Sequence, residues 1–198
     1  MLSRLCAVGV VTLALTGAAT AVDASPRERV LFNEGWRFQK EDAKAAGDAL
    51  SYIKNKEVEA AVIASASEAG LTPAQRELGK DNPFVQAGFA DQSWRKLNLP
   101  HDWGIEGPFD QKLPGETGKL PWMGIGWYRK TFALPAADAG RQIALEIDGA
   151  MSFSLVWCNG QFGGGWPYGY SSFRLDLTPY LPQRSRSKPF RPSSRPWA

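Results

Sequence analysis

One short stretch of the sequence, LPHDWGIEGPFD from Leu99 to Asp110, contains the chain's single histidine together with three carboxylates and a tryptophan. His101 and Asp102 are adjacent, and a histidine beside a carboxylate can act as a general base. No serine, cysteine or metal-ligating group accompanies them at a spacing that would complete a nucleophilic or metal site. We therefore predict a structural corner, in which Asp102 accepts backbone N–H bonds and Trp103 packs. The alternatives are a contribution to a ligand-binding pocket and catalysis by His101.

Aromatic side chains gather close to glycine and proline in other parts of the chain. Sugars stack on indole and phenol rings because the C–H faces of a sugar are apolar, while polar groups bind its hydroxyls. The stretch GGGWPYGY, Gly163–Tyr170, is the strongest candidate for a binding loop, because its glycines would let a ligand approach the backbone. The aromatic residues in or beside predicted turns are Trp122, Trp127, Trp166, Tyr168 and Tyr170.

Other tryptophans lie in runs where apolar and polar residues alternate, and this pattern predicts that they fill a core. For any single tryptophan the core is the favoured interpretation, and Trp127 belongs to both sets. The tryptophans in alternating runs are Trp36, Trp94, Trp127 and Trp157.

Short alternating segments separated by turn residues dominate the chain, especially after Ser93. With 20 Gly, 14 Pro and 12% aromatic residues, the composition favours a β-rich globular protein over a helical bundle or a disordered chain. The pattern predicts an all-β fold, a β-sandwich of the jelly-roll kind. The predicted strands lie within residues 30–38, 94–99, 127–134, 141–150, 151–160 and 172–177, and the first of these ranges contains a predicted turn at Asn33–Gly35.

Residues 43–88 differ in composition from the rest, being rich in Ala, Glu and Lys, and they predict helices. Within them, Thr72 followed by Pro73 is typical of a capped helical turn with proline at its first position. We interpret the segment as a helical or loop insertion in the β domain, with a pair of surface helices as the alternative.

The first residues predict export. Arg4, the apolar run LCAVGVVTLALTGAA and small residues before Ala21 or Ala24 are typical of a secretory signal peptide covering residues 1–24, with a short membrane anchor as the alternative. The mature protein is then expected in the periplasm or outside the cell, with no membrane partner after cleavage.

Cysteine and metal-ligand patterns predict neither a disulfide nor a cofactor. Removal of the signal peptide takes Cys6 away, so the mature chain keeps only Cys158, which is predicted to pack as a small hydrophobe. No cluster of metal-ligand residues occurs, so we expect no metal.

The last residues, 182–198, are basic and rich in Pro and Ser. Without their five basic side chains the formal charge of +3 falls to −2, so the basic character belongs to this tail. We predict that the tail is disordered because it has no apolar periodicity. An exported protein has little use for nucleic acid, so we expect no such partner.

The ordered motifs FNEGWRF, WRKLNLPHDW, GIGWYRKTFALP and ALEIDGAMSFSLVWCNG, followed by GYSSFRLDLTPYL, make the chain similar to a known family. It resembles the N-terminal sugar-binding domain of the family 2 glycoside hydrolases, and best the secreted bacterial β-galactosidase-like members. The resemblance covers residues 30–181 apart from the insertion, and it implies a galactose-binding-like jelly roll.

The resemblance implies that catalysis lies elsewhere. Family 2 enzymes use two glutamates, an acid/base and a nucleophile, both carried by a (β/α)₈ barrel downstream of this domain. This chain has no room for such a barrel, and its only Asn-Glu pair, Asn33-Glu34, does not match the family's acid/base motif. We therefore predict no catalytic residue here, and a barrel of the same enzyme as the partner.

In an intact enzyme, the domain is expected to pack on the barrel and help to bind a β-galactoside. The alternatives are a free-standing carbohydrate-binding module and a non-functional remnant of a truncated gene. The family pattern stops at Leu181, where the resemblance implies a further strand, so we expect a fragment whose sandwich is not closed. The candidate sugar-binding residues are Asp102, Trp122, Trp166, Tyr168 and Tyr170.

Overall fold

A computed structural model describes residues 27–41, 48–51, 54–121 and 124–182. The predicted signal peptide, the tail from residue 183 onwards and Trp122 lie outside these ranges. The chain divides into two units, of which the second begins at Asn33 and contains every strand and helix discussed below. The division into a domain with an inserted segment, as expected from the sequence, stays a prediction.

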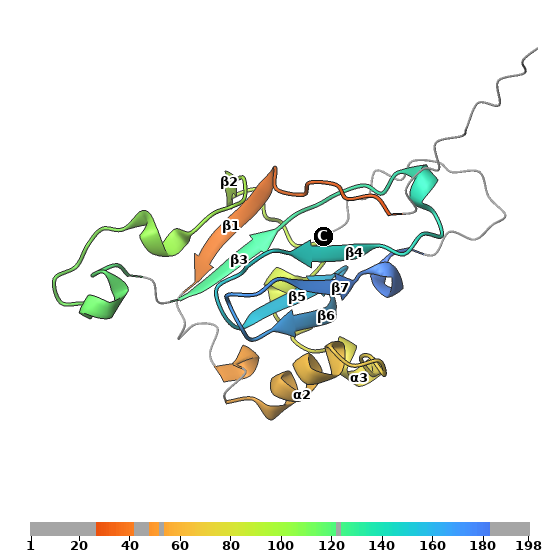
Figure 1. The fold of residues 1–198 in the computed structure, drawn as a ribbon, viewed down its shortest axis with the longest axis horizontal. Coiled ribbons are helices and arrows are strands. Elements are labelled where there is room, and N and C mark those ends of the chain that lie inside the picture. The colour runs from red at the N-terminus through yellow and green to blue at the C-terminus, as the bar shows by residue number, and fades with distance from the viewer. Residues whose placement is uncertain (1–26, 42–47, 52–53, 122–123, 183–198) are drawn as a thin grey trace, which may run out of the picture. The chain divides into compact units, whose positions relative to one another are not determined.

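Antiparallel strands form three small sheets, and the predicted all-β sandwich is confirmed (Figure 1). The largest sheet has the order β2-β1-β3, while β4 pairs with β7 and β5 pairs with β6. The strands are β1 (Trp36–Glu41), β2 (Arg95–Leu97), β3 (Ile125–Arg129), β4 (Ala144–Ile147), β5 (Ser154–Cys158), β6 (Gln161–Trp166) and β7 (Phe173–Asp176).

Helices fill the segment between β1 and β2, as its composition predicts, and two of them pack against β6 (Figure 1). In α3 the Thr72 hydroxyl accepts the Gln75 N–H and Gln75 reaches back to the Thr72 N–H, which confirms the predicted cap. The helical elements here are η1 (Asp48–Leu50), α2 (Lys56–Ser65), α3 (Pro73–Arg76) and η2 (Pro83–Val85). Those in the rest of the chain are η3 (Trp103–Glu106), η4 (Gly115–Thr117), η5 (Ala136–Asp138) and η6 (Thr178–Tyr180).

The core contains the residues that the alternating patterns predict. Phe173 and Leu175 are buried on one side of β7 while the residues after each of them are exposed. Trp94 and Trp127 share a buried cluster with Val85, and Trp157 packs against it. Cys158 is buried, and burial raises the pKa of its thiol to about 11, so it behaves as the predicted small hydrophobe.

Arg129 is a buried cation that the sequence pattern did not predict. Its Nε lies 3.2 Å from Asp91 Oδ2, and its terminal nitrogens donate to the backbone oxygens of Phe84 and Gln86. A buried guanidinium needs such partners because it loses its hydration. Arg129 therefore ties the loop after η2 to the sheet.

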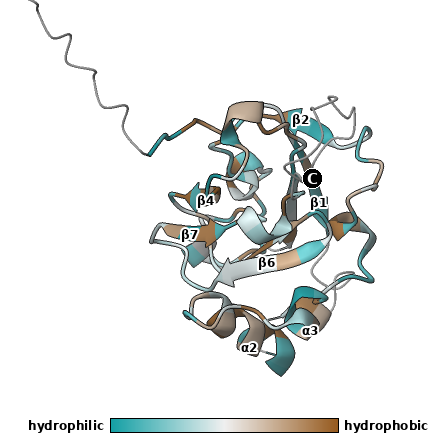
Figure 2. Cartoon of the chain, turned by 90° about the vertical axis from the view of Figure 1, so that its right-hand side faces the viewer, coloured by the Kyte–Doolittle hydropathy of each residue, from teal (hydrophilic) through white to brown (hydrophobic). Residues whose placement is uncertain are grey.

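The first strand is shorter than predicted, and one predicted loop is wrong. The turn expected at Asn33–Gly35 is present, since Gly35 adopts a φ of 70°, and the strand begins only after it, at Trp36 instead of Val30. The glycine run Gly163–Gly165 is not a loop but the middle of β6, which is pale along most of its length in Figure 2 because glycine has a nearly neutral hydropathy.

The glycines of β6 serve packing instead of ligand approach. Gly164 has a φ of 138°, and a Cβ on it would lie 2.7 Å from Leu175 Cδ2 and 3.0 Å from Ser65 Cβ. These distances are too short for any other residue. The glycine run therefore lets α2 and β7 approach the strand closely.

Candidate functional site

The stretch around His101 covers one face of the sheet β2-β1-β3. Phe38 lies between Arg95 and Tyr128 in neighbouring strands, so these three side chains share a face. The His101 ring packs edge-on against Phe38 at 4.7 Å between centroids, and the Arg95 guanidinium lies 5.1 Å from the Phe38 ring. His101 thus sits on a row of side chains contributed by three strands.

Both ring nitrogens of His101 are used by the protein itself. Nδ1 lies 2.8 Å from the Tyr128 hydroxyl, and Nε2 lies 3.0 Å from Glu106 Oε1. Arg95 donates to the same Glu106 oxygen at 2.7 Å. Only 11% of the His101 side chain is exposed. These contacts hold the imidazole in place and favour a structural role over general-base catalysis.

The electrostatics of this cluster keep Arg95, Glu106 and Tyr128 in their ordinary charge states at neutral pH. The hydrogen bond from Arg95, followed by that from His101, holds the pKa of Glu106 below its usual value. The hydrogen bond to Glu106 raises the pKa of Arg95. Burial raises the pKa of Tyr128 to about 12, with smaller effects from the charges of Asp102 and Glu106. Neither Glu106 nor Tyr128 is tuned to exchange protons near pH 7.

The corner predicted for His101–Trp103 is confirmed in its contacts. Asp102 is the N-cap of η3, where its Oδ1 accepts the Gly104 N–H at 2.8 Å. The Trp103 ring lies against Gly126, and the Lys40 ammonium sits 4.4 Å from its centroid. We call the residues Arg95, His101, Glu106 and Tyr128, with Phe38 beneath them, the polar corner.

In contrast to the polar corner, the turn between β6 and β7 exposes large apolar side chains to solvent. Tyr168 and Tyr170 are 59% and 79% exposed, with ring centroids 5.8 Å apart. The turn before β5 lies beside them, because the Phe153 N–H donates to Pro167 O at 3.1 Å and Gly169 contacts Met151. We call Met151, Phe153, Tyr168 and Tyr170 the aromatic platform.

Phe153 adds backbone strain to this platform. Its φ of 60° lies in the left-handed region, which a bulky aromatic residue rarely adopts. About half of its side chain stays exposed, so burial of the ring does not explain the strain. Strained residues of this kind concentrate at binding and catalytic sites, which makes the two turns a candidate functional surface.

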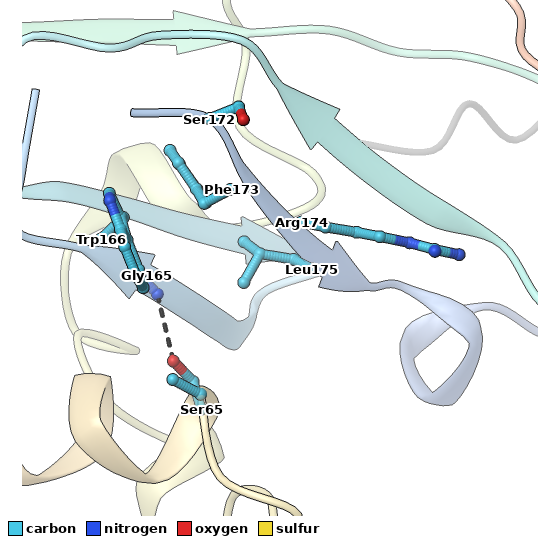
Figure 3. Close-up of a pocket in the computed structure, with 8 residues that line it drawn as sticks. Ser65, Gly165, Trp166, Ser172, Phe173, Arg174 and Leu175 are labelled. Atoms are coloured by element: carbon cyan, nitrogen blue, oxygen red, sulfur yellow. Dashed lines mark hydrogen bonds between the residues drawn. The ribbon is translucent and has the colours of Figure 1, made fainter. Parts of the chain in front are cut away.

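A cavity of about 260 Å³ lies next to the platform, between the end of α2 and the strands β6 and β7 (Figure 3). Trp166 forms one wall of the cavity, and its indole N–H donates to the Ser171 hydroxyl at 2.9 Å. The residues that line it are Ser65, Ala66, Gly165, Trp166, Ser172, Phe173, Arg174 and Leu175.

The structure separates the predicted sugar-binding residues into groups. Tyr168 and Tyr170 lie on the platform, and Trp166 lies at the cavity beside it. Asp102 caps η3 near the polar corner, while Trp127 is buried and its indole donates to Glu41 at 2.6 Å. The roles of these residues in sugar binding stay predictions.

Sequence reasoning missed Met151, Phe153 and Ser65. No local pattern could mark them, because each meets its neighbours across a turn or from another element.

The described residues contain no group of three or more His, Cys, Asp or Glu side chains placed to hold a metal ion. None of the helices in the described ranges has the length and apolar character that crossing a bilayer requires.

No family model matches the chain. A β-galactosidase of Bacteroides ovatus is 42% identical over 159 residues, which are 79% of this chain and 14% of that protein. Among solved structures, a β-glycosidase from Bacteroides vulgatus matches with 34% identity and a TM-score of 0.51, over 77% of this chain and 15% of that one. A glycosyl hydrolase family 2 member from Bacteroides cellulosilyticus matches with 26% identity and a TM-score of 0.50, over 78% and 16% of the two chains.

The matches agree in sequence and in fold, and they leave the greater part of each relative unmatched. The chain spans only about 14% to 16% of the length of these relatives. The chain is therefore a homologue of the family 2 glycoside hydrolases and corresponds to one domain-sized part of such an enzyme.

Proposed function

We propose that the chain is the N-terminal jelly-roll domain of an exported β-galactosidase, in which it binds β-galactosides without cleaving them. The observation that carries this proposal is the aromatic platform, where two tyrosines stand exposed side by side on a strained pair of turns. The 42% identity to a β-galactosidase supports the choice of galactosides.

The chemistry of the platform suits a sugar. The apolar C–H face of a pyranose stacks on a phenol ring, and the phenolic hydroxyl at the ring edge hydrogen-bonds to the sugar. Tyr168 and Tyr170 can offer both, because most of each residue is exposed to solvent. Met151 adds a polarizable contact at the edge of the surface.

The cleavage itself is assigned to the remainder of the enzyme. Retaining glycosidases need two carboxyl groups about 5–5.5 Å apart around the glycosidic bond. The polar corner offers one carboxylate that is already engaged by Arg95 and His101. The chain by itself is expected to show no turnover of chromogenic β-galactosides, and the barrel-bearing remainder of the enzyme is its proposed partner.

Export is part of the same proposal. The signal peptide predicted from the sequence over residues 1–24 supports a periplasmic or extracellular location. The intact mass of the protein from its native host measures this directly. A mass that corresponds to a chain beginning after Ala21 or after Ala24 supports export, whereas a mass that still includes Met1 contradicts it.

Sugar binding by the platform is tested by titrating the full chain with methyl β-D-galactopyranoside. The NMR signals of the four platform residues report binding there, and we call them the platform signals. We expect Tyr168→Ala and Tyr170→Ala each to weaken binding at the platform, because each removes a stacking surface. Phe109→Ala is the matched control, since Phe109 is equally exposed but belongs to the loop after η3. Equal loss in the control, or unchanged binding in both tyrosine variants, contradicts the proposal.

A further inference from the structure

The cavity beside the platform is built by elements that are far apart in the sequence. Ser65 and Ala66 come from the end of α2, Gly165 and Trp166 from the end of β6, and the remaining lining from residues 172–175 at β7 (Figure 3). The close packing of α2 on Gly164 brings the helix end to this place. The helical segment before β2 is therefore what gives the cavity one of its walls.

Trp166 is held rigidly at this cavity. Its indole N–H is bonded to the Ser171 hydroxyl, and its ring stacks with Phe173 at 6.1 Å between centroids and an interplanar angle of 14°. A ring fixed from two directions loses little conformational entropy when a ligand binds. Phe173 and Leu175 are buried and form an apolar floor.

One inward hydroxyl gives the cavity a polar group. Ser65 Oγ donates its hydrogen to Val62 O at 2.7 Å, and the Gly165 N–H points to it at 3.4 Å. A hydroxyl oxygen accepts two hydrogen bonds, so Ser65 can still accept one from a ligand hydroxyl. The Ser172 hydroxyl adds a second polar group where the lining is exposed.

The cavity is not suited to an anion. The Arg174 side chain points away from Trp166 and Ser65 in Figure 3, and its Nε lies 4.0 Å from Glu146. The remaining lining is uncharged. A volume of about 260 Å³ is below the range of about 300–1,000 Å³ that is typical of drug-sized ligands, so it fits one small ring.

We propose that this cavity is a second sugar site, which binds a single neutral pyranose against Trp166 with a ligand hydroxyl donating to Ser65. The site is separate from the platform. It rests on the proposed function in one respect, which is that sugars are the ligands of this chain. It gives α2 a role in ligand binding, because the helix end supplies both Ser65 and the adjoining wall.

The test blocks the cavity without touching its buried floor. Ala66 is exposed at the end of α2, so Ala66→Trp fills the opening, and Ala74→Trp on the exposed side of α3 is the matched control. The full chain is titrated with methyl β-D-galactopyranoside while the NMR signal of the Trp166 indole N–H is followed. We expect a saturable shift in the parent chain and in the control, and at least a tenfold weaker response in Ala66→Trp.

Further arms separate this proposal from the platform. Ser65→Ala is expected to weaken the Trp166 response about five- to tenfold, and the double variant Tyr168→Ala/Tyr170→Ala is expected to leave it unchanged. Methyl β-D-glucuronide, which carries a carboxylate, is expected to bind the cavity more weakly than the galactoside.

The outcomes are distinct. A Trp166 signal that does not move while the platform signals shift overturns the cavity site and leaves the proposed function standing. Binding at Trp166 that survives Ala66→Trp also overturns it, as does tighter binding of the glucuronide. A Trp166 response with silent platform signals overturns the platform but supports the cavity.

Discussion

The polar corner and the aromatic platform differ in what their side chains contact. Those of the corner bind one another, whereas those of the platform are exposed to solvent. In the corner, His101, Glu106 and Arg95 satisfy one another and cover the sheet beneath them. On the platform, Tyr168 and Tyr170 are exposed, although burial of their apolar ring surface would stabilise the folded chain. The corner uses its chemistry to hold the fold, whereas the platform keeps its apolar surface open to solvent.

The difference teaches that titratable residues gathered in sequence do not by themselves mark a site. The corner has the chain's histidine and a shifted pKa at Glu106, yet each group has its partner within the protein. Structural ion-pair networks shift pKa values just as active sites do. The aromatic platform is proposed as the site on different grounds, namely exposed apolar side chains and backbone strain at Phe153.

Removal of the ring beneath the corner should have the largest effect on stability. Phe38 is buried and contacts His101, Tyr128 and Arg95. We expect Phe38→Ala to lower the free energy of unfolding by about 3–5 kcal/mol, because it leaves a cavity under the corner. Urea denaturation measures this. An effect below about 1 kcal/mol would show that the corner does not hold the sheet.

A change in the glycine run tests whether those residues serve packing. Gly164→Ala places a Cβ against Leu175 and Ser65 on a backbone with a φ of 138°, and we expect it to destabilise the protein by about 1–3 kcal/mol. Gly88→Ala is the control, since nothing lies within 4 Å of its Cβ position. Equal stability of the two variants in urea would contradict the close packing of α2 on β6.

Acidification should weaken the corner through Glu106. Because its pKa is lower in the folded state than in the unfolded chain, the stability that it contributes is present above the unfolded pKa and is lost as the pH falls through the folded one. We expect Glu106→Gln to be less stable than the parent at pH 7, with a gap that closes in acid. Urea denaturation across pH 3–7 measures the gap. A gap that widens on acidification would reverse the assigned direction.

The platform should be nearly dispensable for folding. Tyr170 is among the most exposed of the large side chains, so we expect Tyr170→Ala to change the free energy of unfolding by no more than about 0.5 kcal/mol. The same urea measurement used for Phe38→Ala checks this. A loss of more than about 1 kcal/mol would mean that the platform is a structural element like the corner.

Local patterns in the sequence predicted much of the fold. The alternation in Phe173 and Leu175 placed them in the core, since neighbouring side chains of a strand point to opposite faces. Thr72 and Pro73 predicted a helix start because capping depends only on adjacent residues. Asp102 as a cap also follows from local chemistry, and the family resemblance agreed with the homologues found.

The tertiary structure alone decided what the glycines and the candidate site residues do. Gly163–Gly165 had the composition of a flexible loop, but contacts with Ser65 and Leu175 made the segment a packed strand. The platform joins turns that are well separated in the chain, and the cavity depends on α2 reaching β6. The residue types in the sequence determine which side chains can stack or hydrogen-bond. Which of them remain exposed and which are buried in the core depends on packing between segments that are far apart in the chain.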